Sequence, residues 1–257
     1  MNGRLVDGGR CDGGTAGRPV LGVVVPAHDE QELLPGCLDA LARAVRALDG
    51  RATVRTVVAL DACTDGSAGV ARAAGATTVR LVARRVGAAR RAGVDALLAT
   101  GPVDWIATTD ADSAVPAGWL HAHLDALADG HDALVGTVAV TDWADHPDDV
   151  RSWFRDVYDL SGDPHPHVHG ANLGVRTSAY RAVGGFAPLR TGEDVALVAA
   201  LGAGGHRVHR TRTTPVATSA RRVGRAEHGF AGRLVSLGGD RTAPPVAGAR
   251  AGSRGTA

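Results

Sequence analysis

Lysine is absent from this sequence of 257 residues, so all 28 of its basic residues are arginine. They nearly balance the 27 acidic residues, and a net charge of +1 with histidine neutral argues against a general attraction to nucleic acid or to an anionic membrane. Arginine without lysine, beside abundant alanine and glycine, is typical of coding bias. The arginine content alone therefore indicates little about phosphate binding.

Cysteine and long apolar runs are also scarce. Cys11, Cys37 and Cys63 are odd in number and never spaced as C-x-x-C, which argues against a disulfide framework or a structural zinc site and favours a reducing compartment. No apolar run approaches the roughly 20 residues of a membrane-spanning helix. The first 18 residues lack the apolar stretch of a signal peptide. These absences predict a cytoplasmic protein without an integral membrane segment.

The apolar content, 44% of the residues, is enough for one large core. Residues 1–18 and 240–257 are rich in glycine and arginine without apolar periodicity, so both ends are predicted to be disordered tails. Residues 19–239 are predicted to form a single domain, with a nucleotide-binding half at 19–113 and an acceptor half at 114–239.

Within this domain, short apolar runs alternate with amphipathic stretches. Strands are expected at 20–25, 54–60, 78–82, 105–109, 133–140, 173–175 and 207–209, and helices at 34–48, 66–74, 86–98, 150–160 and 195–201. This alternation predicts an α/β fold with a mostly parallel central sheet and helices on both faces. Ligands of such sheets bind outside the carboxyl ends of the strands, where this sequence places charged and polar residues.

Asp110 and Asp112 follow the strand expected at 105–109 and form a D-x-D pair. Two carboxylates spaced in this way at a strand end can both reach one hard divalent cation, Mg²⁺ or Mn²⁺. The alternative is a plain turn, in which aspartate is common. The position at the carboxyl edge of the sheet favours the metal site.

Five segments, taken in order, resemble family 2 and related GT-A glycosyltransferases. They are Val23–Glu30, Val58–Ser67, Asp110–Asp112, Gly170–Arg176 with Gly184–Phe186, and Gly192–Asp194. The series extends over most of the chain. The resemblance implies a GT-A, Rossmann-like nucleotide-diphospho-sugar transferase fold. It also implies transfer of a sugar from a nucleotide-diphosphate donor to a hydroxyl of a small-molecule, lipid or carrier acceptor.

The resemblance also implies roles for residues of the nucleotide-binding half. Pro26, Ala27 and Glu30 would line the nucleotide pocket, and Asp61 would recognise the base or ribose. The family often has a second acidic residue just before this aspartate, where this chain has Leu60, so the identity of the nucleotide stays open. Asp65 is instead expected to cap the next helix or to brace the turn.

Arginine can bind a diphosphate through its planar fork, and similar enzymes carry a glycine-rich, often basic segment before D-x-D. Arg84 or Arg90 is therefore a candidate donor contact, although most arginines of this segment are expected to be ordinary surface charges. Asp110, with Asp112, would hold the cation and through it the donor. His209 is a candidate third metal ligand, because some GT-A enzymes use a histidine late in the chain.

Glu193 and Asp194 match the Glu-Asp pair of the family, whose aspartate is the expected catalytic base of inverting members. Capping of the following helix would also explain both carboxylates. His165, His167 and His169 are expected in a solvated loop near the acceptor, and zinc binding there is undecided.

Two alternatives to a glycosyltransferase stay open. A sugar-phosphate nucleotidyltransferase has a related sheet, but it would need a glycine-rich cradle for a triphosphate where this chain has Pro-Ala-His-Asp-Glu. A non-catalytic nucleotide-sugar binding protein of the same fold is the other alternative. A polysaccharide synthase is disfavoured, because the Gln-x-x-Arg-Trp motif of processive synthases is missing.

Overall fold

A computed structural model describes residues 17–140, 143, 148–154, 158 and 164–219 of the chain. Nearly all of the N-terminal tail, the whole C-terminal tail and the last part of the helix expected at 150–160 lie outside these residues. Within the described part of the chain, no helix combines the length and the apolar character needed to cross a bilayer.

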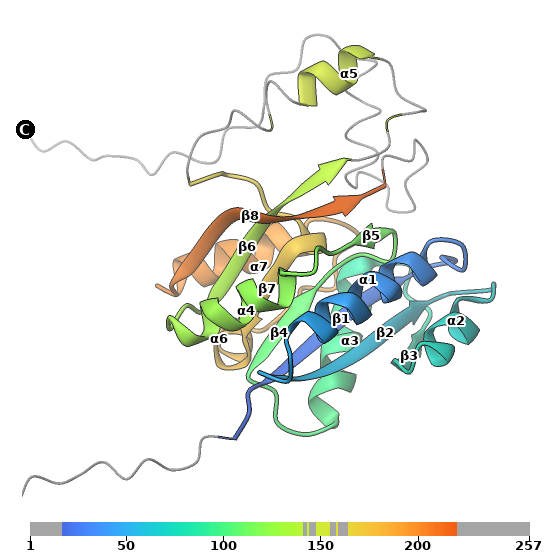
Figure 1. Ribbon diagram of the computed structural model, residues 1–257, viewed down its shortest axis with the longest axis horizontal. Helices are drawn as coiled ribbons and strands as arrows, with labels where there is room; N and C mark the ends of the chain where they lie inside the picture. Colours follow the sequence, from blue (N-terminus) through green and yellow to red (C-terminus); the bar gives the residue numbers. More distant parts are fainter. Residues whose placement is uncertain (1–16, 141–142, 144–147, 155–157, 159–163, 220–257) are drawn as a thin grey trace, which may run out of the picture.

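The centre is an eight-stranded sheet with the order β3-β2-β1-β4-β7-β6-β8-β5 (Figure 1). The strands are β1 (Val20–Ala27), β2 (Thr53–Asp61), β3 (Thr77–Leu81), β4 (Trp105–Thr108), β5 (Ser113–Ala114), β6 (Ala133–Val140), β7 (Leu173–Arg176) and β8 (Val208–Thr218). β1 to β4 run parallel, and so do β6 and β8. β7 is antiparallel to β4 and β6, and β5 is antiparallel to β8. The predicted mostly parallel sheet is confirmed.

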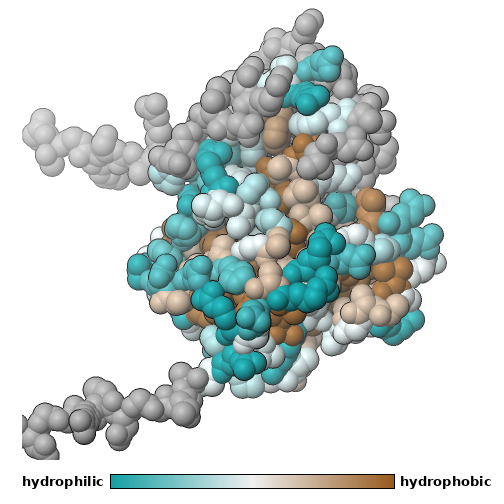
Figure 2. All heavy atoms as spheres, in the orientation of Figure 1, coloured by the Kyte–Doolittle hydropathy of each residue, from teal (hydrophilic) through white to brown (hydrophobic). Residues whose placement is uncertain are grey.

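Helices cover both faces of the sheet. α1 (Leu34–Ala47), α2 (Ser67–Ala73) and α4 (Trp119–Ala128) bury their apolar residues in one core, and α3 (Val86–Ala99), α6 (Thr177–Ala182) and α7 (Glu193–Ala203) bury theirs in the other. A short α5 (Asp148–Trp153) follows β6, and a 3-10 turn, η2 (Gly170–Asn172), precedes β7. On the face in Figure 2, hydrophobic and hydrophilic side chains are interspersed.

The alternation of side chains along β1 explains why both faces need cover. Leu21, Val23 and Val25 enter the core beneath α1, whereas Val24 enters the core beneath α3. A Cβ atom at Gly93 of α3 would lie 2.4 Å from Val24 Cγ1, and one at Gly22 would lie 2.1 Å from a methyl group of Leu97. Glycine at both positions therefore lets α3 lie close against β1.

The structure corrects several expected boundaries. β1 continues through Pro26 to Ala27, beyond the last residue paired with β4. β8 is eleven residues long, not three, because its alternating arginine and threonine residues give no apolar signal. β5, α4 and α6 were not predicted.

Candidate active site

The carboxyl ends of β1 and β2 bring two polar loops together at one edge of the sheet. The N–H of Thr64 donates to Asp29 Oδ1 at 2.6 Å, and the N–H of Gln31 donates to Asp65 Oδ2 at 2.9 Å. Glu30, predicted to line the nucleotide pocket, is buried, and its N–H donates to Ser67 Oγ at 2.9 Å. The two loops therefore form one connected wall of the site.

Asp29, Cys63 and Asp65 offer ligand atoms within 4.8 Å of one another, the spacing of a metal site. Backbone hydrogen bonds already engage these carboxylates: Asp65 Oδ1 accepts from the N–H of Ser67 at 3.0 Å, and the N–H of Thr64 lowers the pKa of Asp29. Asp29 also adopts a left-handed backbone with φ of 51°. The contacts indicate that the cluster braces the turn, which agrees with the role expected for Asp65.

Asp61, the predicted ligand of the base or ribose, is buried at the end of β2. Its Oδ1 accepts the N–H groups of Ala83 and Arg84 at 2.7 and 2.9 Å, and its Oδ2 accepts the N–H of Arg85 at 2.9 Å. Three backbone donors fix the segment after β3, including the left-handed backbone of Arg84 at φ of 51°. The Arg84 side chain is exposed at this edge.

Pro26 and Ala27, the other residues predicted to line the nucleotide pocket, lie at the end of β1 beside Ala59 and Leu60 of β2. Ala27 is buried, and its carbonyl oxygen accepts a hydrogen bond from Cys63 Sγ at 3.2 Å. Both residues are therefore at the carboxyl edge of the sheet.

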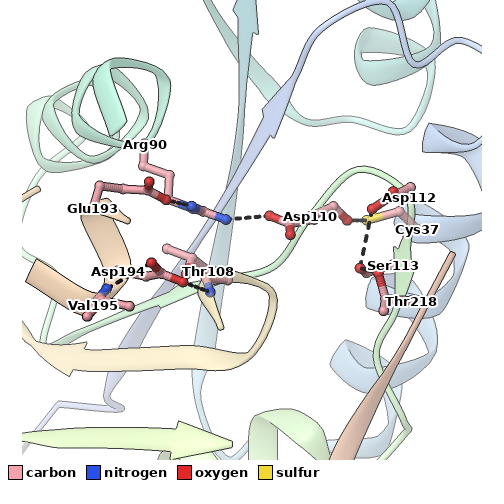
Figure 3. A network of polar contacts seen from close by, with 11 residues as sticks. Cys37, Arg90, Thr108, Asp110, Asp112, Ser113, Glu193, Asp194, Val195 and Thr218 are labelled. Atoms are coloured by element: carbon pink, nitrogen blue, oxygen red, sulfur yellow. Dashed lines mark hydrogen bonds and ion pairs between the residues drawn. The ribbon is translucent and has the colours of Figure 1, made fainter. Parts of the chain in front are cut away.

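The D-x-D pair lies at the same edge, after β4. The N–H of Ser113 donates to the Asp110 carbonyl at 3.1 Å and closes a turn that begins at Asp110. The Asp110 side chain is 36% exposed and its Oδ1 pairs with Arg90, toward which the carboxylate points in Figure 3. Asp112 lies on the other side of the turn, near Cys37 and Ser113 (Figure 3). Ser113 Oγ donates to Thr218 Oγ1 at 3.0 Å, which ties the turn to β8.

Arg90 and Glu193 form a buried ion pair between α3 and α7. The side chains are 4% and 2% exposed, so neither faces solvent. The two terminal nitrogens of Arg90 divide their contacts: Nη1 pairs with Glu193 Oε1 and Nη2 with Asp110 Oδ1. One guanidinium therefore connects the D-x-D turn to the first residue of α7 (Figure 3).

Asp194 follows Glu193 and is held by backbone donors. Its Oδ2 accepts the N–H of Gly170 at 2.7 Å, and its Oδ1 accepts the N–H of Val195 at 2.8 Å. The carbonyl of Gly170 in turn accepts a hydrogen bond from Thr108 Oγ1 at 2.6 Å, at the end of β4. Gly170 thus joins the partly buried Asp194 carboxylate to the end of the strand that precedes the D-x-D pair.

His209 is not brought to the D-x-D pair. It lies in β8 opposite Leu134, three strands across the sheet from β4, which is about 14 Å at the usual strand spacing. Its exposed ring stacks on His131 with ring centroids 4.8 Å apart. Ligands of one cation lie about 2 Å from it, so the geometry does not support the predicted third ligand.

The three alternating histidines do not form the solvated loop that was expected. His165 is fully buried with Nε2 3.1 Å from the Thr211 carbonyl, and burial lowers its pKa. His167 stacks on Tyr158 at 3.9 Å, and His169 Nε2 lies 2.9 Å from the Tyr158 hydroxyl. The segment therefore supports the tyrosine, and none of its histidines belongs to a group of metal-binding geometry in the described residues.

A cavity of about 420 Å³ lies between the carboxyl-terminal half of β6 and the middle of β8. Trp143, Phe154 and Tyr158 line it together with the guanidinium-bearing Arg151 and Arg212. Through Tyr158, His169 and the following Gly170, this cavity is connected to the Asp194 carboxylate.

Asn172 is a central residue whose role the motif did not reveal. It is fully buried, accepts a hydrogen bond from Trp119 Nε1 at 2.8 Å, and donates through Nδ2 to the carbonyls of Thr137 and Thr214, both at 2.8 Å. Its carbonyl partners lie where the register between β6 and β8 shifts. Part of this role could be inferred from the sequence, because a tryptophan such as Trp119, when it is buried, needs an acceptor for its indole N–H.

Comparison with solved structures shows what the fold is similar to. A mannosyltransferase from Pyrobaculum calidifontis, solved with GDP-Man and Mn²⁺, superposes with a TM-score of 0.61 at 19% identity over 80% of this chain and 59% of that chain. TarS 1–349 from S. aureus, solved with UDP-GlcNAc, gives a TM-score of 0.58 at 15% identity over 82% and 61%. The chain thus spans about three fifths of the length of these two proteins.

A third structure, glucosyl-3-phosphoglycerate synthase from Mycobacterium tuberculosis in complex with Mn²⁺, UDP and glucosyl-3-phosphoglycerate, gives a TM-score of 0.57 at 19% identity over 87% of this chain and 79% of that one. These likenesses confirm the predicted GT-A fold. No curated protein matched the sequence itself.

The sequence profile described as Glycosyl transferase family 2 matches residues 22–184, which is more than half of the chain. The match includes most of β1, the D-x-D turn and η2, and it ends before α7, which carries Glu193 and Asp194. The profile and the fold agree with the resemblance found in the five sequence segments. The chain therefore belongs to glycosyl transferase family 2.

Proposed function

We propose that this enzyme transfers a sugar from a nucleotide-diphosphate donor to an acceptor hydroxyl with the help of Mg²⁺ or Mn²⁺, and with inversion at the anomeric carbon. The observation that carries the proposal is the arrangement around Gly170. Its N–H binds the Asp194 carboxylate and its carbonyl binds Thr108, so a base candidate and the D-x-D turn meet at one edge of the sheet. The mannosyltransferase and the synthase named above, which have a similar fold, were each solved in complex with a nucleotide and Mn²⁺.

The side chains of the D-x-D turn suit a divalent cation. Carboxylate oxygens are the ligands that Mg²⁺ and Mn²⁺ prefer. Arg90 contacts only Oδ1 of Asp110, and Oδ2 has no partner among the described residues. Asp112 is partly buried on the other side of the same turn. In the proposal Asp110 and Asp112 hold the cation, which supplies positive charge to the departing diphosphate.

Asp194 is the proposed base. Two backbone donors orient its carboxylate, and its partly buried position leaves it accessible at the edge of the site. It would accept the proton of the acceptor hydroxyl while that oxygen forms a bond to the anomeric carbon and the bond to the diphosphate oxygen breaks. Glu193 is buried away from this position, so we propose no direct proton transfer for it.

The same arrangement suggests where the donor and the acceptor bind. We propose that Pro26, Ala27, Glu30 and Asp61 shape the nucleotide pocket, with Asp61 also holding the segment that carries Arg84. The exposed Arg84 side chain is the proposed contact to the donor diphosphate. The cavity beside Tyr158 is the proposed entrance for the acceptor, a small molecule, a lipid or a carrier, since Tyr158 is connected to Asp194 through His169 and Gly170.

A thermal-shift panel of UDP-, GDP- and dTDP-sugars, with and without Mn²⁺, tests the donor and metal assignments. Asp112→Asn is the variant to use, because Asp110 also holds Arg90 and its loss would disturb the fold. Asp39→Asn, an exposed carboxylate on α1, is the matched control. We expect a metal-dependent shift with one nucleotide that is lost in Asp112→Asn and kept in Asp39→Asn. A folded wild-type protein that responds to no nucleotide would contradict the proposal.

A further inference from the structure

A single guanidinium, that of Arg90, joins the two ends of the proposed site. It pairs with Asp110 on the D-x-D turn and with Glu193 at the start of α7, one residue before Asp194. A Cβ atom at Gly170 would lie 2.3 Å from Arg90 Cζ, so the guanidinium packs directly against the backbone that binds Asp194. Arg90 therefore contacts every segment that carries a proposed metal ligand or the proposed base.

Arg90 is too deeply buried to contact the donor diphosphate directly, although the sequence made it a candidate for that contact. Its side chain is 4% exposed, and both terminal nitrogens are engaged by carboxylates. Its Nε has no partner among the described residues and is also buried. The geometry fits a residue that holds other groups in place.

The charges of the cluster suggest how it does so. A guanidinium at Asp110 fixes that carboxylate, but its positive charge also opposes a divalent cation bound to the same residue. Glu193 places a negative charge on the opposite nitrogen of Arg90, in surroundings where charges are weakly screened by water. The pair as a whole is neutral, so it can orient Asp110 without repelling the cation.

We propose that Arg90 and Glu193 are a charge-balanced positioning pair, in which Arg90 orients Asp110 and α7 while Glu193 keeps the positive charge of Arg90 from weakening cation binding. The proposal rests on the cation site of the proposed function. It assigns Glu193, the first residue of the Glu-Asp pair, a role through Arg90 rather than in proton transfer.

Titration of Mn²⁺ alone, followed by the electron paramagnetic resonance signal of the free ion, measures the charge effect without a known substrate. Glu193→Gln leaves the positive charge of Arg90 uncompensated, so we expect Mn²⁺ binding to weaken on the order of tenfold. A unit charge a few ångströms from a divalent ion has an effect of this size even at the dielectric constant of water. The double variant Arg90→Met/Glu193→Gln removes both charges, and its Mn²⁺ affinity should return to within about threefold of the wild type. Glu32→Gln, at an exposed residue, is the control and should bind as the wild type does.

The double variant also separates charge from position. Its turnover of the donor found in the nucleotide panel should stay at least tenfold below that of the wild type although Mn²⁺ binding is restored, because nothing then holds Asp110 and α7 together. Wild-type turnover in this variant, unchanged binding in Glu193→Gln, or a double variant as weak as Glu193→Gln would each overturn the inference. Equal Mn²⁺ binding by the wild type and Asp112→Asn would instead contradict the proposed cation site, which keeps the two failures distinct.

Discussion

Replacement of Asn172 by alanine is expected to destabilise the protein severely, because this one amide satisfies three polar groups, two of them in buried hydrogen bonds. It accepts from Trp119 Nε1 and donates to the carbonyls of Thr137 and Thr214, each at 2.8 Å. A net contribution of about 1 kcal/mol for each hydrogen bond, with the added penalty for a stranded indole N–H, amounts to roughly 3–5 kcal/mol. That loss is a large part of the stability of an ordinary domain, which is about 5–15 kcal/mol.

Urea unfolding, monitored by tryptophan fluorescence and circular dichroism, measures the effect of Asn172→Ala, and a double-mutant cycle with Trp119→Phe tests its cause. Trp119→Phe removes the indole N–H, so Asn172→Ala should cost about 1–2 kcal/mol less in that background than in the wild type. A cost below about 1 kcal/mol for Asn172→Ala, or additive effects of the two changes, would refute the assigned role of this amide.

Two further predictions concern packing and pH. Gly93→Ala should destabilise the fold by about 1–3 kcal/mol in urea unfolding, because its Cβ would lie 2.4 Å from Val24 Cγ1. Gly36→Ala is the control: a Cβ at this position of α1 would have no atom within 4 Å, so the change should be neutral or stabilising. Burial lowers the pKa of His123 to about 3 from an ordinary value near 6.5. The unfolded state therefore binds the extra proton first, and stability falls as the pH drops from 6.5 toward 3. His123→Gln should reduce that slope by about 1.4 kcal/mol per pH unit, and an unchanged slope would contradict burial of a neutral ring.

The sequence was most informative where structure is local and apolar. The continuous run at 20–25 predicted β1, and the leucines of 34–48 predicted α1, because their periodicity reflects burial directly. It was least informative for β8, whose arginine and threonine residues resemble a polar loop. β8 is held by pairing with β6 and β5, and partners so distant in sequence leave no local pattern.

For the candidate site, too, the sequence predicted some features and missed others. The sequence indicated that Asp61, Asp110 and Asp194 lie at carboxyl ends of strands or at a helix start, and the structure places them there. It could not show that Asp61 binds the backbone of residues 83–85, because a hydrogen-bond partner depends on how a loop folds back. The histidine proposal at His209 was based on order along the chain alone, and order does not fix which strands are neighbours.

The helical periodicity of α3 predicts that Arg90 is buried, but the high arginine content of the chain made this position easy to overlook. In α3, the buried residues include Gly87, Arg90, Gly93, Val94 and Leu97, which repeat at steps of three and four and mark the face that packs on the sheet. A charged side chain on such a face must find partners of opposite charge, because leaving a buried charge unpaired costs about 3–5 kcal/mol. In a chain where every basic residue is arginine, Arg90 differs from its neighbours by its phase on the helix. That phase predicts carboxylate partners for Arg90 better than any count of arginines does, and the structure provides two, the buried Glu193 and the partly exposed Asp110.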